Sequence, residues 1–206
     1  EDWAEKIPAV LYSWYAGMEG GNALARILFG EANPSGKLPF TIPATPDHLP
    51  YFSTTDREIT YDLYHGYTLL DKRGWQPAYP FGFGLSYTTF AYRDLQGEMV
   101  DQALQITARV ANTGPRDGEE IVQVYVSMED SAIERQRKLL KGFEKVFIPA
   151  GEVVDVTITI PLAELCYYDA APKQWRLEPG TYQVLVGPSS DERTMLKTTI
   201  KLTPDA

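Results

Sequence analysis

The sequence predicts a mixed fold, in which the terminal piece of an α/β domain precedes an all-β sandwich. A buried-looking strand, a pair of glycines and an apolar helical stripe follow one another within residues 7–30. Short runs of alternating apolar residues, separated by turn signals, fill residues 91–202. Between these parts lies Pro80–Phe90, whose mixture of aromatic residues and glycines suits neither an amphipathic helix nor an alternating strand.

The first predicted element is a strand, a glycine turn and a helix. The run Ala9-Val10-Leu11-Tyr12 is apolar throughout, as in a buried parallel strand. Gly20 and Gly21 precede the helix, Gly30 is placed to cap it in the left-handed conformation, and its apolar stripe comprises Ala23, Leu24, Ile27 and Leu28. A parallel strand needs neighbours on both sides, so we expect the rest of this sheet to come from outside the chain. Residues 1–50 are therefore predicted to end an α/β domain of a longer protein.

A proline-rich stretch over residues 31–90, which overlaps the end of this unit, predicts an ordered strap with little regular structure. Proline fixes its own φ and favours an extended conformation in the residue before it. The prolines and glycines here include Pro34, Gly36, Pro39, Pro43, Pro46, Pro50, Gly66, Gly74 and Pro77. We expect aromatic side chains to hold the strap, which we define as residues 51–90, against a surface: Tyr51, Phe52, Tyr61, Tyr64, Tyr67, Trp75 and Tyr79.

The segment Pro80–Phe90, called the connector below, closes the strap. Gly82 and Gly84 let the backbone turn, or approach another surface where a Cβ atom would clash. Large apolar faces for docking come from Phe81, Phe83, Tyr87 and Phe90. The connector is therefore predicted to fix how two domains sit together.

Residues 91–206 are predicted to form an antiparallel β-sandwich of about seven strands. Apolar residues alternate with period two at Leu104 to Val110, Val122 to Val126, Val154 to Ile160, Tyr182 to Val186 and Leu196 to Leu202. Turn signals separate the runs at residues 112–118, 149–152 and 178–180. No catalytic signature occurs within this region.

Composition narrows the classes of function. The formal net charge of −9 argues against a nucleic-acid-binding or anionic-membrane surface, because both need a basic face. No apolar stretch approaches the roughly 18 residues of a membrane span, so the chain is expected to be soluble, with its compartment left open. The single cysteine, Cys166, excludes an internal disulfide and is expected to be a core residue. With only two histidines, no metal site and no cofactor are expected.

Five motifs in order resemble the carboxy-terminal part of glycoside hydrolase family 3, of the β-glucosidase type. They are Met18-Glu19-Gly20-Gly21-Asn22-Ala23 with Leu28-Phe29-Gly30, then Asn33-Pro34-Ser35-Gly36-Lys37-Leu38-Pro39, the connector, Leu140-Lys141-Gly142-Phe143-Glu144-Lys145-Val146, and Pro179-Gly180-Thr181-Tyr182. The resemblance implies that residues 1–50 end an α/β sandwich domain, that residues 51–90 link it onward, and that residues 91–206 form a fibronectin type III-like domain of the immunoglobulin-like class.

The family implies retaining hydrolysis of terminal β-D-glucosyl residues, which requires two carboxyl groups about 5–5.5 Å apart. In the family the nucleophilic Asp lies in a barrel domain and the acid/base Glu in the α/β sandwich, upstream of this sequence. No residue of the chain is therefore assigned a catalytic role, and the chain is expected to supply scaffold and to be inactive alone. Its expected partners are the amino-terminal barrel and sandwich portion, a β-glucoside or oligosaccharide substrate and, as an option, further copies of itself. The alternative is a stand-alone carbohydrate-binding or protein-interaction module.

A few residues remain as candidate contacts. Glu19 stands at a helix amino terminus, where the macrodipole stabilises an anion, and it is also the one candidate for substrate binding. His65 is either a hydrogen-bonded strap residue or a sugar contact, and Thr68 stands where the family usually has an arginine. Tryptophans that could stack on sugars, but that more often belong to cores, are Trp14, Trp75 and Trp175. The basic stretch Glu134–Lys138 is either a solvated loop or a contact with an acidic surface on a neighbouring domain or subunit.

Overall fold

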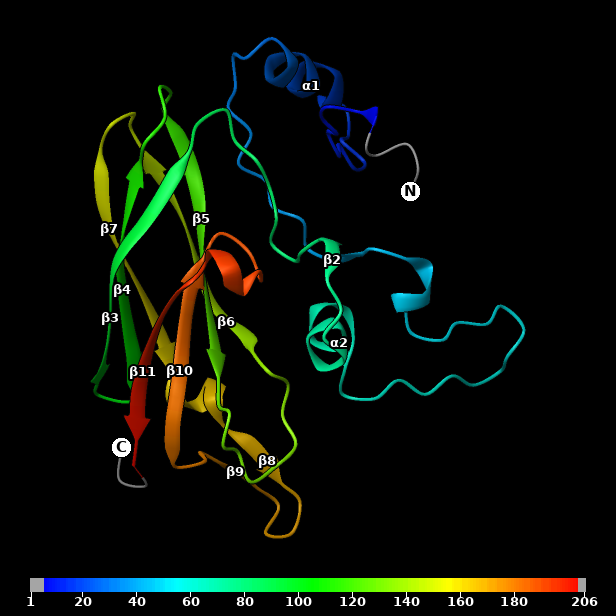
Figure 1. Ribbon diagram of the computed structural model, residues 1–206, viewed down its shortest axis with the longest axis vertical. Helices are drawn as coiled ribbons and strands as arrows, with labels where there is room; N and C mark the ends of the chain where they lie inside the picture. Colours follow the sequence, from blue (N-terminus) through cyan, green and yellow to red (C-terminus); the bar gives the residue numbers. More distant parts are fainter. Residues whose placement is uncertain (1–5, 204–206) are drawn as a thin grey trace.

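The structure, a computed structural model, describes residues 6–203. A β-sandwich forms one side of the molecule, and the amino-terminal segment and the strap lie beside it (Figure 1). Within the described range, no helix is long and apolar enough to cross a membrane.

Seven strands build the sandwich, as the sequence predicts. One sheet has the order β11-β10-β5-β6 and the other the order β3-β4-β7. Every neighbouring pair in both sheets is antiparallel. The strands are β3 (Phe90–Val100), β4 (Ala103–Asn112), β5 (Gly118–Ser127), β6 (Leu139–Ile148), β7 (Val153–Pro161), β10 (Gly180–Gly187) and β11 (Leu196–Leu202).

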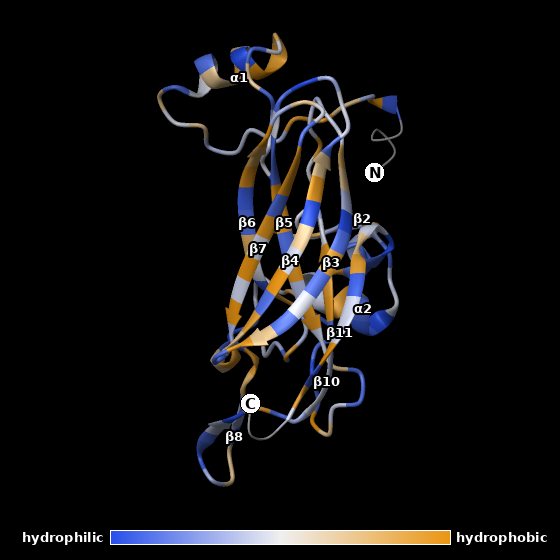
Figure 2. Ribbon diagram, turned by 90° about the vertical axis from the view of Figure 1, so that its left-hand side faces the viewer, coloured by the Kyte–Doolittle hydropathy of each residue, from blue (hydrophilic) through white to orange (hydrophobic). Residues whose placement is uncertain are grey.

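The core lies between these two sheets. Alternate residues of each strand point inward, so hydrophobic and hydrophilic positions alternate along β4 and β7 (Figure 2). Leu104, Val124 and Val184 are fully buried there. Fully burying one such side chain stabilises the fold by about 1.5–3 kcal/mol, which makes this core the main source of stability.

Small elements complete the sandwich and the strap. A two-stranded ribbon, β8 (Tyr167–Asp169) with β9 (Gln174–Arg176), projects from one end of the sandwich (Figure 1). Another joins β1 (Ile42–Pro43) to β2 (Pro77–Tyr79) and so ties the two ends of the proline-rich stretch together. The 3-10 turns are η2 (Pro46–His48), η3 (Leu162–Leu165) and η4 (Glu192–Thr194).

The amino-terminal part confirms the predicted helix but not the predicted strand. Helix α1 spans Gly20–Leu28, and Gly30 follows it at φ +75° and donates its amide to the Ile27 carbonyl at 2.9 Å, as expected of a left-handed cap. Residues 9–12, predicted to be a buried parallel strand, form no strand and are exposed. The reason is that no other strand of the described chain lies beside them to share their backbone hydrogen bonds.

The strap contains a helix that the sequence analysis missed. Helix α2 spans Gly66–Arg73 and ends at Gly74, whose φ of +68° is left-handed. The prediction that aromatic residues anchor the strap is right for Tyr64, which is 7% exposed, but wrong for Tyr51, Phe52 and Tyr61, all of which are more than half exposed. These three lie in the long excursion between η2 and α2, which is away from the sandwich in Figure 1.

Candidate functional site: the docking interface between the strap and the sandwich

The strap covers part of the outer face of the four-stranded sheet. Gln123 and Tyr125 on β5 are 3% and 0% exposed. The Tyr125 ring meets Tyr67 of α2 edge-on, with ring centroids 5.9 Å apart, and Tyr67 in turn packs on Phe81 of the connector at 5.2 Å. The sandwich therefore has a second apolar contact layer outside its core, supplied by the strap.

The connector meets this face through Gly82. The Gln123 side-chain amide donates to the Gly82 carbonyl at 3.2 Å and to the Pro188 carbonyl at 2.6 Å, while the Tyr125 hydroxyl donates to Gln123 Oε1 at 2.7 Å. Gly82 has φ +78°, and a Cβ atom there would overlap the Gln123 side chain. The Ser190 amide also donates to the Phe81 carbonyl at 2.8 Å. The predicted role of this glycine in close backbone approach is confirmed.

Gly84 makes the same kind of approach toward the amino-terminal part. A Cβ atom at Gly84 would overlap the carbonyl oxygen of Gly36. Next to it, the Leu38 amide donates to the Phe83 carbonyl and the Gly82 amide donates to the Leu38 carbonyl, both at 2.8 Å. The connector is thus held between the amino-terminal segment on one side and the sandwich on the other.

A buried ion pair crosses the same junction. Lys37 Nζ lies 2.9 Å from Glu120 Oε1 on β5, and the two side chains are only 10% and 5% exposed. Lys37 also donates to the Gly84 carbonyl at 3.2 Å. Removing either partner would leave the other charge desolvated without compensation, so this pair fixes the relative position of the two segments.

Asn33 joins three segments with one side chain. Its Oδ1 accepts hydrogen bonds from the Ser86 hydroxyl and the Tyr87 amide, both at 2.8 Å, and its Nδ2 donates to the Asp117 carbonyl at 2.9 Å. Tyr87 in turn donates its hydroxyl to the Ile27 carbonyl of α1 at 2.8 Å. The Asn-Pro-Ser-Gly motif is therefore a docking motif in this structure.

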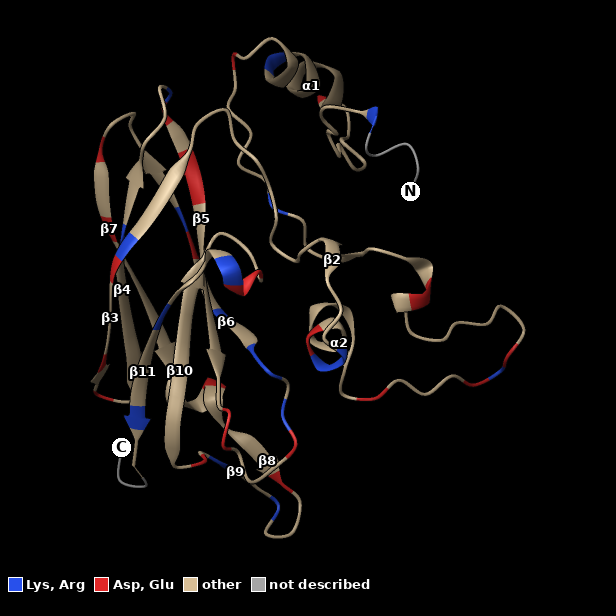
Figure 3. Cartoon of the chain, in the orientation of Figure 1, with Lys and Arg blue, Asp and Glu red and all other residues tan. Residues whose placement is uncertain are grey.

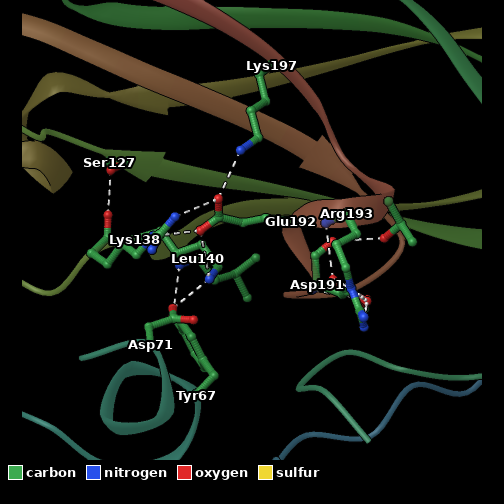
Figure 4. Close-up of polar contacts among 12 residues, drawn as sticks. Tyr67, Asp71, Ser127, Lys138, Leu140, Asp191, Glu192, Arg193 and Lys197 are labelled. Atoms are coloured by element: carbon green, nitrogen blue, oxygen red, sulfur yellow. Dashed lines mark hydrogen bonds and ion pairs between the residues drawn. The ribbon is translucent and has the colours of Figure 1, made fainter. Parts of the chain in front are cut away.

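A charged cluster fastens α2 to the sandwich. Lys138, whose side chain is 2% exposed, lies 2.5 Å from Asp71 of α2 and 3.3 Å from Glu192 of η4 (Figure 4). Glu192 is also paired with Arg137 and Lys197, each at 2.9 Å. The sequence analysis did not identify this cluster, because Asp71 belongs to the helix that was not predicted.

The pKa values of the two carboxylates in this cluster, Asp71 and Glu192, are shifted in opposite directions. Burial raises the pKa of Asp71, and the hydrogen bond from Lys138 only partly offsets that rise. Burial acts in the same sense on Glu192, but the hydrogen bond from Lys197 and the charges of Lys138 and Arg137 outweigh it and lower the pKa of Glu192 to about 2. Glu192 is therefore the firmly ionised centre of the cluster.

The rest of the basic stretch also faces the strap. Glu134 accepts a hydrogen bond from the Tyr64 hydroxyl at 3.0 Å and pairs with Lys72 of α2 at 3.1 Å, and Gln136 donates to the Leu63 carbonyl at 3.2 Å. Acidic and basic positions accordingly line the facing segments of α2 and the loop that joins β5 to β6 (Figure 3). Of the two interpretations of Glu134–Lys138, the structure supports the contact with acidic groups, and these groups lie on the same chain.

The structure places the remaining candidate residues apart from one another. Glu19 is the N-cap residue of α1 and accepts a hydrogen bond from Asn22 at 2.7 Å. Trp14 is half exposed and packs edge-on against Tyr12 and Phe40, and Trp175 is 70% exposed on β9. The rings of Trp75 and His48 stack at 4.3 Å. Cys166 is only partly buried, and its thiol contacts the Leu162 carbonyl at 3.6 Å.

His65 and Thr68 act together at the start of α2. The His65 amide donates to the Thr68 hydroxyl at 3.2 Å, and that hydroxyl donates to the His65 carbonyl at 2.8 Å. Thr68 is 5% exposed. The residue that departs from the family pattern therefore stabilises the first turn of the helix in this chain.

The geometry suits docking rather than bond-making chemistry. The buried or partly buried carboxylates of Glu120, Glu178, Asp71 and Glu192 each have a cationic partner within 3.3 Å. Among residues 6–203, no group of three or more His, Cys, Asp and Glu side chains is arranged to hold a metal ion. The interface holds the amino-terminal segment, the strap and the sandwich in one arrangement.

Comparison with known proteins divides the chain into two parts, as the fold does. Residues 1–87 match the glycosyl hydrolase family 3 C-terminal domain, and residues 120–190 match the fibronectin type III-like domain. Thermostable beta-glucosidase B of Acetivibrio thermocellus is 39% identical over 97% of this chain, which covers 28% of that protein. Beta-glucosidase BoGH3A of Bacteroides ovatus is 36% identical over 92% of this chain, which covers 27% of that protein.

Solved structures show the same arrangement of the chain. Beta-glucosidase 3B from Thermotoga neapolitana in complex with alpha-D-glucose superposes with a TM-score of 0.89 and 36% identity over 97% of this chain and 29% of that one. Beta-glucosidase from Kluyveromyces marxianus gives a TM-score of 0.90 and 37% identity over 98% of this chain and 25% of that one. The chain spans less than a third of the length of these relatives. It belongs to glycoside hydrolase family 3, whose C-terminal domain it joins to a fibronectin type III-like domain.

Proposed function

We propose that the protein containing this chain is a retaining β-glucosidase that removes terminal β-D-glucosyl residues from the non-reducing ends of its substrates. The observation that carries the proposal is that relatives named as β-glucosidases are 36–39% identical to the chain over more than nine-tenths of its length. A retaining mechanism uses one carboxylate as nucleophile and a second carboxyl group as acid and base, about 5–5.5 Å apart.

In this proposal the chain supplies scaffold and domain docking, and the catalytic carboxylates lie on other sequence. The buried carboxylates of the described residues support this division, because Glu120 and Glu178 are each paired with a cation within 3.0 Å. A carboxylate held in this way is not free to attack a sugar or to exchange a proton. The proposed partners are an amino-terminal barrel and the remainder of the α/β sandwich, and residues 1–50, 51–90 and 91–206 are the proposed structural units.

Glu19 is the one residue of the chain that we propose as a substrate contact. It is exposed at the amino terminus of α1, where the only hydrogen bond of its side chain among the described residues comes from Asn22. Exchange of Glu19 for Gln in the whole enzyme is expected to raise KM with little change in kcat if the contact exists. Unchanged KM and kcat would leave Glu19 with its role at the helix end.

The test compares the chain alone with the same chain preceded by its amino-terminal portion, using p-nitrophenyl β-D-glucoside. We expect no hydrolysis by the 206 residues and hydrolysis by the combined protein. NMR of the first product should show β-glucose, because a double displacement retains configuration. Hydrolysis by the chain alone would contradict the scaffold role, and α-glucose as the first product would contradict the retaining mechanism.

A specific feature favours the second candidate function, a carbohydrate-binding module. Tyr168 and Trp175 face each other across the β8–β9 ribbon and are 51% and 70% exposed. Exposed aromatic rings can stack on sugar rings. Retention of the chain by insoluble β-glucan, lost on Trp175→Ala but kept on Trp14→Ala, would establish this function, and no retention would exclude it.

A further inference from the structure

A cavity lies where the loop between β5 and β6 passes the β8–β9 end of the sandwich, and the charged cluster of Asp71, Lys138 and Glu192 does not line it. Its volume is about 210 Å³, many times the ~10–15 Å³ that one water needs. Apolar walls come from Leu63 of the strap, Val126 of β5, Met128 directly after β5, and Leu165 of η3. Its charged lining residues are the cations Arg135 and Lys141 and the carboxylates Glu134, which pairs with Lys72 of α2, and Glu164.

Lys141 reaches the cavity from an irregularity in β6. In the β5–β6 ladder Val124 pairs with Gly142 and Tyr125 pairs with Leu140, so Lys141 has no partner residue and forms a bulge. Bulges redirect a side chain and occur often beside functional sites. The only hydrogen bond of the Lys141 ammonium is to the backbone carbonyl of Glu164, and no carboxylate lies within ion-pair distance among residues 6–203. Burial lowers the pKa of Lys141, the charge of Glu164 partly offsets that effect, and the charge of Arg135 adds to it.

Arg135 also has unused hydrogen-bonding capacity. Its Nε donates to Ser131 at 3.1 Å and to Glu178 at 3.0 Å, and its guanidinium lies over the Tyr167 ring at 5.3 Å. The terminal Nη2 is buried without a hydrogen-bond partner among the described residues. Leaving a charged donor unsatisfied is costly, so a buried one indicates an ion or ligand that completes it.

From the bulge at Lys141, the unsatisfied guanidinium of Arg135 and the apolar walls, we infer that this cavity binds a small organic monocarboxylate. The carboxylate lies between the two cations and accepts from both, because Arg and Lys donors to a carboxylate form strong charge-assisted hydrogen bonds. The apolar body of the ligand lies against Met128 and Leu165. The site does not depend on glucoside hydrolysis and is distinct from the proposed contact at Glu19.

Benzoate is a suitable probe because it combines a carboxylate with a flat apolar body, and benzamide is its neutral counterpart. Isothermal titration calorimetry on the 206-residue chain is expected to show saturable binding of benzoate and none of benzamide. Lys141→Met keeps the apolar stem and removes the charge, and it should weaken benzoate binding by about tenfold or more, the loss of one charge-assisted hydrogen bond. Lys145→Met is the matched control, because Lys145 lies on the same strand and pairs with Glu119 at 2.7 Å outside the cavity.

A second measurement locates the ligand without any variant. In a chain carrying ¹³C-methyl methionine, benzoate should shift the Met128 signal and leave that of Met18, which is 98% exposed on the amino-terminal segment. No saturable binding, equal binding of benzamide, equal weakening by Lys145→Met, or no shift at Met128 would each overturn the inference. Equal binding of inorganic phosphate would also overturn it, because phosphate has no apolar body to contact the walls.

Discussion

The Gln123 side chain occupies the space that a Cβ atom on Gly82 would need, and it donates a hydrogen bond to the Gly82 carbonyl at 3.2 Å. Gln123 belongs to a central strand of the sandwich, and Gly82 belongs to the connector. The same contact therefore requires a glycine in one segment and a long polar side chain in the other. The glycine of the connector motif is therefore explained by the contact with Gln123, which holds the strap on the sandwich.

Gly82→Ala is expected to destabilise the chain by about 2–5 kcal/mol. The left-handed backbone costs a non-glycine residue about 1–2 kcal/mol, and overpacking against Gln123 adds about 1–3 kcal/mol. Gly74→Ala is the matched control, because Gly74 has φ +68° but nothing within 4 Å of its Cβ position, so only the backbone cost applies. Urea unfolding measures both variants, and equal losses would show that the contact with Gln123 is unimportant.

Lys138→Met should destabilise the chain by about 3 kcal/mol, the usual cost of removing one partner from a buried ion pair. The loss arises because Asp71 and Glu192 would remain partly buried with one cation fewer. Arg193→Met is expected to cost far less than Lys138→Met, since Arg193 is 76% exposed in its pair with Asp191 and solvent screens that pair. Thermal and urea unfolding compare the two, and similar losses would contradict the assigned importance of Lys138.

The stability of the chain should fall with acid through Glu192. Its pKa is about 2 in the folded protein against 4.5 for a free side chain, so its contribution is complete above pH 4.5 and is lost as the pH falls toward 2. Asp71 affects the acid stability in the opposite sense. Burial raises its pKa, so the folded chain takes up this proton at a higher pH than the unfolded chain does. Glu192→Gln should therefore flatten the decline of Tm between pH 4.5 and 2 while lowering Tm at pH 7.

The matched control for this pH dependence is Glu144→Gln on β6, an exposed glutamate without an ion-pair partner among the described residues. It should leave both the Tm at pH 7 and the slope in acid unchanged. If the Tm of the Glu192→Gln variant fell as steeply in acid as the Tm of the unaltered chain, another carboxylate would be responsible for the acid dependence.

Thr68→Val should destabilise the chain by about 1 kcal/mol, the typical value for a hydroxyl that satisfies a helix end. The substitution keeps the branched shape but removes both hydrogen bonds to the His65 backbone. Thr68→Ser keeps the hydroxyl and should recover most of the loss. Urea unfolding followed by circular dichroism checks both, and equal stability of Val and Thr at this position would rule out the capping role.

The sandwich could be predicted because its strands follow local patterns. In β4, alternate residues face the core from Leu104 to Val110, and the pattern survives because one face of the strand is buried along its whole length. Strand β3 was not identified, since its ladder with β4 shifts register between Arg93 and Gln96, where Asp94 takes φ +55°. A bulge interrupts the alternation on which the prediction depends.

The docking interface could be predicted only in part. The glycines of the connector indicated a close approach, because few other roles require Gly82 and Gly84 two residues apart. Their partners could not be named, since Gln123 and the Gly36 carbonyl are distant in sequence and carry no motif that pairs them with glycine. The charged cluster was missed because Asp71 belongs to helix α2, which was not predicted, and because it lies 67 residues from Lys138 in the sequence.

The sequence by itself determined the family, the β-sandwich, helix α1 and the need for glycine in the connector, because motifs, periodicity and backbone freedom are local properties of the chain. The tertiary structure alone decided that Lys138 lies buried between Asp71 and Glu192, that Gln123 receives Gly82, and that residues 9–12 form no strand without neighbours. Burial and pairing depend on which distant segments come together. The free energy of a charge or a backbone amide is set by those neighbours rather than by its own residue type.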